Sequence, residues 1–280
     1  MAITEAYIDE LSAWRAEMSK RLRSPYSWLA LAGLFWLDEG ENSLGSAPGS
    51  RIQLPARAPT MLGSLHLANG QVLLRPAPGA ALSAGADPNA GEHTVKGETH
   101  LDDDHSTQPT FLFWQDVRML LLKRGERYAI RVWDPQRPER QTATGRIWFL
   151  PDPAARVTAR IERFDPPLRV LRDDIVGIQQ EAEMHAALHF EYGGVLCAPQ
   201  AELLEDGSYY LLFKDATAGK GSYGAGRFLT SEQPIGDEVV LDLNKLYSPP
   251  CAFTEFATCP LPQASNVLPM AIEAGERYEG

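Results

Sequence analysis

The first residues of the chain carry apolar side chains at the spacing of an amphipathic helix. Steps of three and four residues separate Tyr7, Ile8, Leu11, Trp14, Met18 and Leu22, as one face of a helix requires. Thr4 is suited to cap this helix at its start, with Glu5 behind it. We therefore expect a helix over residues 4–22 with one buried face. The apolar stretch that follows, between Pro25 and Gly40, predicts a short helix or turn that closes one end of a β-structure.

From Asn42 onward, short apolar runs alternate with turn residues. Asn69-Gly70 lies between two alternating runs, which indicates a two-residue hairpin with positive φ at both central residues. The same pattern surrounds Arg124-Gly125 and Asp206-Gly207. The regular alternation of strands and helices that is typical of a parallel sheet is missing. The sequence predicts a mainly β protein (a β-rich α+β fold), an antiparallel sandwich or barrel with an N-terminal helix.

The order of these patterns suggests three segments. We expect an N-terminal helical segment over residues 1–40, a β-sandwich-like half over residues 41–165, and a second β half over residues 166–280. A soft boundary near residue 165 follows a region rich in prolines, which suit edge strands and connections better than central strands: Pro135, Pro138, Pro151, Pro153, Pro166 and Pro167. The two β halves are expected to pack as one unit.

Composition narrows the classes of partner. The chain has 280 residues and a formal net charge of −11, and its basic residues are scattered, so its field would repel a polyanion and nucleic acid is not expected as a partner. The longest apolar run, Trp28–Leu37, covers about half the length that a membrane span needs. The N-terminus has no basic region followed by an apolar core. We therefore expect a soluble, cytoplasmic protein that is not bound to a membrane.

Gly219, Gly221 and Gly224 have the spacing G-x-G-x-x-G, which binds phosphates in dinucleotide-binding folds. That role requires the glycines to leave a strand directly and to open a helix. Five residues separate these glycines from the preceding apolar run, and Gly226, Pro234 and Gly236 oppose a helix after them. Nucleotide binding is therefore not expected. Two interpretations stay open: a structural turn, or a loop whose N–H groups form an anion-binding concavity beside Lys214, Lys220 and Arg227.

The same region carries a family resemblance. Its glycine loop and the tail that follows resemble the signature D-x-T/S-x-G…Y-G-x-G-R-[FY]-L, then D-F-N-x-x-Y-N-P-P-C…C-P-L-P-P-x-N-x-L, of a bacterial family known as domain-of-unknown-function family 1684. The matching positions are Asp215, Thr217, Gly219, Tyr223, Gly224, Gly226, Arg227, Asp242, Asn244, Tyr247, Pro249, Pro250, Cys251, Cys259, Pro260, Pro262, Asn266 and Leu268.

The chain departs from that signature at Leu243, at Ser248, and at Gln263 with Ala264 and Ser265. These differences affect the expected shape of the tail loop. Residues 14–46 also resemble the opening of the family, so the resemblance extends over nearly the whole chain. It implies no established activity.

A second resemblance concerns residues 42–134, whose layout is similar to a forkhead-associated sandwich. The residues that read phosphothreonine in that fold are replaced, since Gly45-Ser46 stands in place of Gly-Arg and Thr60–Ser64 in place of Ser-x-x-His. The resemblance therefore favours a sandwich and does not imply phosphopeptide recognition.

Polar residues on glycine- and proline-rich loops of the last third suggest a pocket for a small polar, anionic ligand. Arg227 is the expected anchor, because its planar guanidinium can hold a carboxylate or phosphate through two hydrogen bonds. The remaining lining residues are expected to be Asp215, Tyr223, Asp242, Asn244 and Asn266. An Arg–Asp pair of this kind can also be purely structural. The pattern specifies no cofactor and no metal site.

Two other functions stay open. Cys251 or Cys259 could be a nucleophile or metal ligand in a hydrolytic or redox enzyme, with His185 or His189 as partner. The cysteines could equally be structural, and with Cys197 their number is odd, so we expect thiols and keep a Cys251–Cys259 disulfide as the alternative. The third possibility is a homo-oligomer that associates through the N-terminal helix and residues 28–36.

Overall fold

The computed structural model describes residues 4–143 and 145–279. The chain divides into two compact units, Met1–Arg21 with Thr144–Gly280, and Leu22–Ala143. Both are built mainly of antiparallel strands, and the first also contains the N-terminal helix. This confirms the mainly β fold class. Within the described ranges, no helix is both long and apolar enough to cross a membrane.

The unit Leu22–Ala143 is a sandwich of two sheets. One sheet has the order β1-β11-β10-β9-β6-β7 and the other β3-β2-β4-β5-β8; only β2 and β3 pair in parallel. Its core takes buried side chains from both sheets, among them Leu44, Leu65, Met119 and Ile130. The strands are β1 (Leu31–Trp36), β2 (Gly40–Gly45), β3 (Ile52–Gln53), β4 (Gly63–Ala68), β5 (Gln71–Pro76), β6 (Ser83–Gly85), β7 (His93–Thr94), β8 (Thr99–Leu101), β9 (Phe111–Trp114), β10 (Val117–Arg124) and β11 (Arg127–Trp133), followed by the short helix α2 (Glu139–Thr142).

The two expected hairpins of this unit are present. Asn69 and Gly70 join β4 to β5 with φ of 53° and 72°, as a two-residue turn with left-handed central residues requires. β10 and β11 pair from Arg118 to Arg124, with Gly125 at φ 56° in the turn. The prediction for residues 25–40 was wrong: a single 3₁₀ turn at Trp28–Ala30 leads directly into β1, which pairs with β11. A short run that is apolar throughout suits a buried strand as well as a helix.

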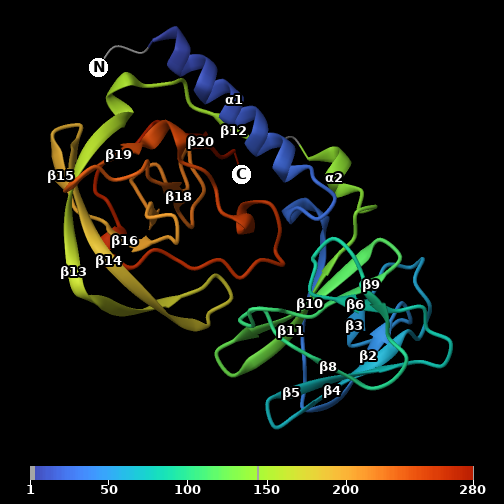
Figure 1. Cartoon of the computed structure of the whole chain (residues 1–280). Coiled ribbons are helices and arrows are strands. Elements are labelled where there is room, and N and C mark those ends of the chain that lie inside the picture. Colours follow the sequence, from blue (N-terminus) through green and yellow to red (C-terminus); the bar gives the residue numbers. More distant parts are fainter. Residues whose placement is uncertain (1–3, 144, 280) are drawn as a thin grey trace. The chain divides into compact units, whose positions relative to one another are not determined.

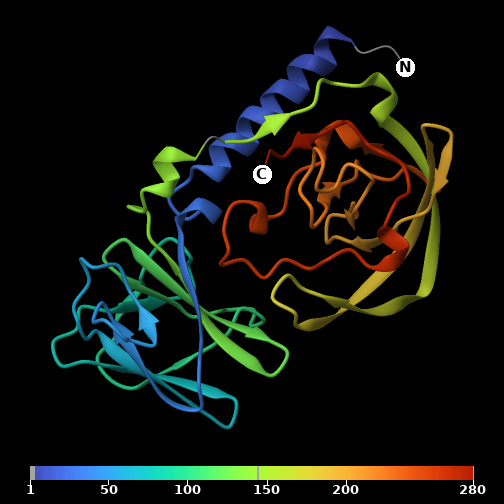
Figure 2. The same ribbon diagram turned by 180° about the vertical axis from the view of Figure 1, so that it is seen from behind.

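The other unit is a strongly curved sheet of order β18-β17-β16-β14-β13-β19, with β15 paired to β14. Figures 1 and 2 show β13 and β14 curving around the last third of the chain, drawn in orange and red. A backbone hydrogen bond from Glu232 to Val240 links the segments of the two end strands, so the sheet is nearly closed. The strands of the curved sheet are β13 (Arg156–Asp173), β14 (Gln179–Tyr192), β15 (Val195–Cys197), β16 (Gln200–Leu203), β17 (Tyr209–Phe213), β18 (Arg227–Thr230) and β19 (Glu238–Asp242). The strands β12 (Ile147–Trp148) and β20 (Glu276–Arg277) pair with each other in a separate two-stranded sheet.

Prolines, a glycine and short 3₁₀ turns shape the strands and connections of this unit. β13 runs through residue 165, where the soft boundary was expected, and its pairing with β14 is irregular between Arg163 and Leu168, the segment that contains Pro166 and Pro167. Gly207, at φ 86°, lies in the expected hairpin between β16 and β17. Four 3₁₀ turns support the loops: Pro153–Ala155, Leu243–Lys245, Pro250–Ala252 and Ala264–Asn266.

The helix α1 (Glu5–Leu22) confirms the expected N-terminal helix. The hydroxyl of Thr4 accepts a hydrogen bond from the backbone N–H of Tyr7 at 3.2 Å, which is the predicted cap. Leu11 is buried, and the ring of Trp14 packs edge-on against Trp148 at 5.4 Å between centroids. Trp14 on the apolar face of α1 therefore packs within its own unit.

Candidate functional site

Arg227 and Asp215 form an ion pair that is enclosed in the protein. The guanidinium of Arg227, at the start of β18, is fully buried and donates to the Asp215 carboxylate at 2.7 Å and to the backbone carbonyl of Ile272 at 2.8 Å. It also donates to the carbonyl of Ala274. The other carboxylate oxygen of Asp215 accepts bonds from Thr217 and from the N–H of Ile272. The pair thus ties residues 272–274 to the barrel and is not accessible to a ligand from solvent.

The charge of Arg227 also decides the protonation state of Asp215. Burial by itself raises the pKa of this carboxyl, because the charged form loses its hydration. The neighbouring guanidinium and the hydrogen bonds from Thr217 outweigh burial and hold the pKa of Asp215 below its usual value. The carboxylate is therefore ionised at neutral pH and balances the buried cation.

Asp242 and Asn244 lie elsewhere and hold the N-terminal helix. The hydroxyl of Tyr7 on α1 donates to the Asp242 carboxylate at 2.9 Å, and the side-chain amide of Asn244 donates to the same hydroxyl at 3.0 Å. Asn244 also exchanges two hydrogen bonds with the backbone of Asp152. Burial, with the Asp242 carboxylate second, raises the pKa of Tyr7 well above its usual value. The polar atoms of these side chains therefore hydrogen-bond within the unit and are not directed at a ligand.

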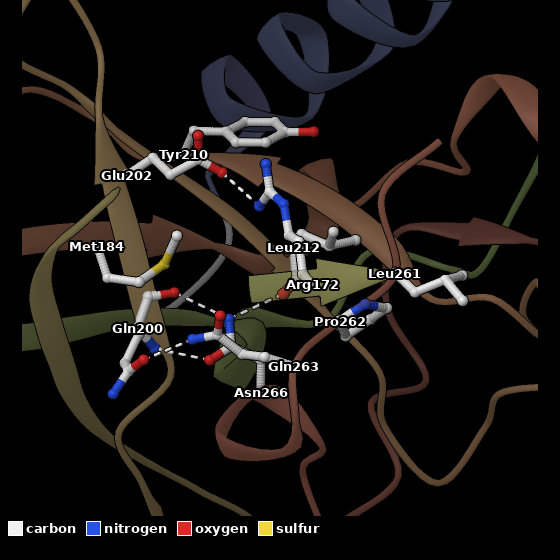
Figure 3. Close-up of a pocket in the computed structure, with 10 residues that line it drawn as sticks. All are labelled: Arg172, Met184, Gln200, Glu202, Tyr210, Leu212, Leu261, Pro262, Gln263 and Asn266. Atoms are coloured by element: carbon white, nitrogen blue, oxygen red, sulfur yellow. Dashed lines mark hydrogen bonds and ion pairs between the residues drawn. The ribbon is translucent and has the colours of Figure 1, made fainter. Parts of the chain in front are cut away.

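Asn266 joins two strands inside the barrel. Its amide donates to the backbone carbonyls of Gln200 and Leu212 at 2.8 and 2.9 Å, and its oxygen accepts from the N–H of Gln200. Figure 3 shows it beside a small cavity that is also lined by the Arg172–Glu202 ion pair. The cavity measures about 10 Å³, which is room for about one water molecule. A ligand does not fit there.

Tyr223 belongs to a larger hollow formed by the glycine loop. The carbonyl of Thr217 accepts hydrogen bonds from three successive N–H groups, those of residues 220–222, which makes the loop a compact turn. Gly219 has φ of 75°, where a side chain would be strained. The N–H of Tyr278, just after β20, donates to the carbonyl of Gly221 and fixes the end of the chain against the loop. The loop continues into the strand β18, so the helix that nucleotide binding requires is not formed.

The hollow has a volume of about 380 Å³, within the range of small-molecule sites. Its floor is backbone, because an added Cβ would meet no atom within 4 Å at Gly219 and only the Cα of Gly219, at 4.0 Å, at Gly224. Two tyrosine rings in edge-on contact, 4.9 Å between centroids, form one wall. The lining residues are Gly219, Lys220, Gly221, Ser222, Tyr223, Gly224, Arg277, Tyr278 and Glu279.

The charged groups around this hollow are two cations and one anion. Lys220 is exposed and, among residues 4–143 and 145–279, forms no ion pair. Arg277 pairs with Glu279, whose side chain is 69% exposed. Such an exposed pair contributes about 0–1 kcal/mol, so an incoming anion can displace it. The N–H of Gly224 also has no acceptor within the described part of the chain.

The cysteines and histidines of the enzyme hypothesis are not brought together. The histidine rings, both on β14, bond to other groups, His185 to the backbone of Glu183 and Leu203 and His189 to the Glu162 carboxylate. Neither ring hydrogen-bonds a cysteine in the region that the structure covers. No group of three or more potential metal ligands gathers within that region either. Cys251 and Cys259 instead lie next to each other, with the N–H of Cys251 3.3 Å from the Cys259 sulfur.

The residues that were expected to line one pocket therefore lie in separate places. Of the residues predicted to line it, Tyr223 alone lines the hollow, while the others fill buried networks. Of the three cations expected beside the glycine loop, Lys220 is in the lining. Sequence reasoning missed Arg277, Tyr278 and Glu279. The signal was a tyrosine between the charged residues Arg277 and Glu279, in a segment that lies far from the glycine loop in sequence.

Comparison with known proteins supports the family resemblance. A family model described as "Protein of unknown function (DUF1684)" matches residues 144–277. The chain belongs to this family. The matched segment contains the glycine loop, both neighbouring cysteines and β20, and it does not extend to the N-terminal part of the resemblance.

A solved structure is also similar. The solution NMR structure of an uncharacterized protein from Haloarcula marismortui is 31% identical, and the alignment covers 50% of this chain and 80% of that chain with a TM-score of 0.42. None of the curated proteins compared with the chain matches it. The family description names no activity.

Proposed function

We propose that the protein binds a small anionic ligand in the hollow between the glycine loop and the end of the chain. The observation that carries this proposal is the combination of an accessible volume of about 380 Å³ with the Lys220 ammonium at its edge, which forms no ion pair with any residue that the structure describes. Lys220 supplies the charge, Arg277 supplies a guanidinium that can hold two oxygens, and the N–H of Gly224 adds a neutral donor. These are the donors that carboxylates and phosphates prefer.

The net charge of the chain implies that anions are attracted only at a local site and not by the protein as a whole. At −11 overall, the protein repels anions at a distance, and only a site with converging donors can hold one. The bare glycine floor keeps side chains out of the hollow, and the two tyrosine rings offer an apolar surface to the rest of the ligand. The ligand class is therefore a small molecule with a carboxylate or phosphate group.

Thermal unfolding with two probe anions, inorganic phosphate and succinate, tests this function. A ligand at ten times its Kd stabilises the folded form by about 1.4 kcal/mol, which corresponds to a rise in Tm of about 3–6 °C for a unit of this size. We expect at least one probe to produce this rise beyond that of sodium chloride at equal ionic strength.

Lys220→Ala should reduce that rise. An ammonium at about 4 Å from the bound anion contributes about 1 kcal/mol or more to the binding free energy, so its removal should lower the affinity about fivefold. Lys96→Ala is the matched control, since it removes the same charge from an exposed position in the other unit. Equal rises in wild type and Lys220→Ala, or no rise beyond chloride with either probe, would contradict the proposal.

A further inference from the structure

Cys251 and Cys259 are close enough to react with each other. Cys251 lies in the 3₁₀ turn Pro250–Ala252, and its N–H donates to the sulfur of Cys259 at 3.3 Å. Both cysteines are thiols rather than part of a disulfide. The hydroxyl of Tyr223 donates to the carbonyl of Cys251 at 2.8 Å and fixes the turn from the other side.

The two thiols differ in a way that suits a two-step reaction. Cys251 is partly exposed, whereas Cys259 is 5% exposed. The neighbouring Cys259 thiol lowers the pKa of Cys251 in spite of its burial. Thiolates are the nucleophiles in disulfide exchange, and reactive thiols combine access with a lowered pKa. Cys251 is thus placed as the attacking thiol and Cys259 as the resolving thiol.

We propose that Cys251 and Cys259 form a reversible thiol–disulfide pair that reacts with small organic disulfides. In the first step the Cys251 thiolate attacks one sulfur of the small disulfide, a mixed disulfide forms, and a small thiolate leaves. In the second step Cys259, after losing its proton, attacks the Cys251 sulfur, and the second small thiol is released. The protein loses two protons and two electrons, and the small disulfide gains them. The reaction does not depend on a ligand in the hollow.

Cys197 provides an internal contrast. Its sulfur lies 3.5 Å from that of Met270, it is buried, and burial raises its pKa. A thiol of this kind is a poor nucleophile. The proposal therefore predicts that one thiol of the three stays unreacted.

The test is incubation of the full chain with oxidised glutathione, quenching in acid, alkylation and intact mass measurement with peptide mapping. Wild type should lose two hydrogens, carry one alkyl group on Cys197, and yield a peptide pair linked between residues 251 and 259. Cys259→Ser should instead retain one glutathione on Cys251, and Cys251→Ser should react many times more slowly. Cys197→Ser is the matched control and should form the disulfide at the wild-type rate.

A persistent mixed disulfide in wild type, a linkage that involves Cys197, or three thiols that remain alkylatable would overturn the proposal. Peptide mapping of the wild type tests the proposal by itself. The result therefore stands even if one of the variants folds poorly. Treatment of the oxidised protein with dithiothreitol should restore both thiols, and failure to do so would exclude a reversible pair.

Discussion

Arg227→Ala should strongly destabilise the protein, because Arg227 is part of a buried network and does not line the hollow. The substitution leaves the Asp215 carboxylate buried without its cation and removes the donors to the carbonyls of Ile272 and Ala274. Breaking a buried ion pair on one side costs about 3–5 kcal/mol, and each buried carbonyl left unpaired adds about 1–3 kcal/mol. The sum is comparable with the whole stability of an ordinary domain, about 5–15 kcal/mol.

Urea unfolding followed by circular dichroism measures this loss. Arg277→Ala is the matched control, because it removes the same side chain from an exposed position and should change the free energy of unfolding by less than about 0.5 kcal/mol. The same control should lose affinity for the probe anion. A stable Arg227→Ala protein that no longer binds the anion, beside an Arg277→Ala protein that binds it normally, would refute the assignment of roles.

The pH dependence of Arg227→Ala gives an independent check. In the wild type the folded pKa of Asp215 is below the unfolded value, so its contribution to stability is present above a pH of about 4 and is lost as the pH falls. Without Arg227, burial raises the folded pKa above the unfolded value. The contribution of this carboxyl in the variant should then increase as the pH falls towards 4. The same sign in both proteins would contradict the account of the pair.

Three further predictions concern the hollow and the helix α1. Glu279→Gln frees the guanidinium of Arg277 and should tighten binding of phosphate or succinate in calorimetric titrations; weaker binding would contradict the displacement of Glu279 by the ligand. Gly224→Leu should fill the hollow and abolish binding while the Tm of the free protein stays within about 2 °C, with Gly97→Leu, at an open position in the other unit, as the unaffected control. Tyr7→Phe removes the hydrogen bonds to Asp242 and should lower the free energy of unfolding by about 1–3 kcal/mol, measured in urea; an unchanged value would argue against the attachment of α1 by this network.

The parts of the fold that could be predicted from sequence depend on local geometry. Asn69-Gly70 specifies its turn because few residue pairs accept positive φ at both positions, and the spacing from Tyr7 to Leu22 specifies a helix face. The run Leu31–Trp36 lacks such a signal, because every position is apolar or small and its pairing with β11 decides its conformation. A short apolar run takes its structure from its neighbours.

The site was harder to predict for a different reason. Arg227 looked like a ligand anchor because residue identity shows its guanidinium donors. It does not show that the backbone carbonyls of Ile272 and Ala274 lie beside them and accept their hydrogen bonds. Arg277 was missed because its place beside the glycine loop arises from pairing between distant segments. Backbone acceptors and long-range pairing decide whether a charged group is buried or available, and neither is visible in residue identity.

The most direct test of the central claim is a titration of ¹⁵N-labelled protein with inorganic phosphate, followed through the backbone amide signals. The account predicts saturable shifts confined to residues 219–224 and 277–279, with about fivefold weaker affinity in Lys220→Ala. Shifts spread over the surface, or a saturable response centred on other residues, would contradict it.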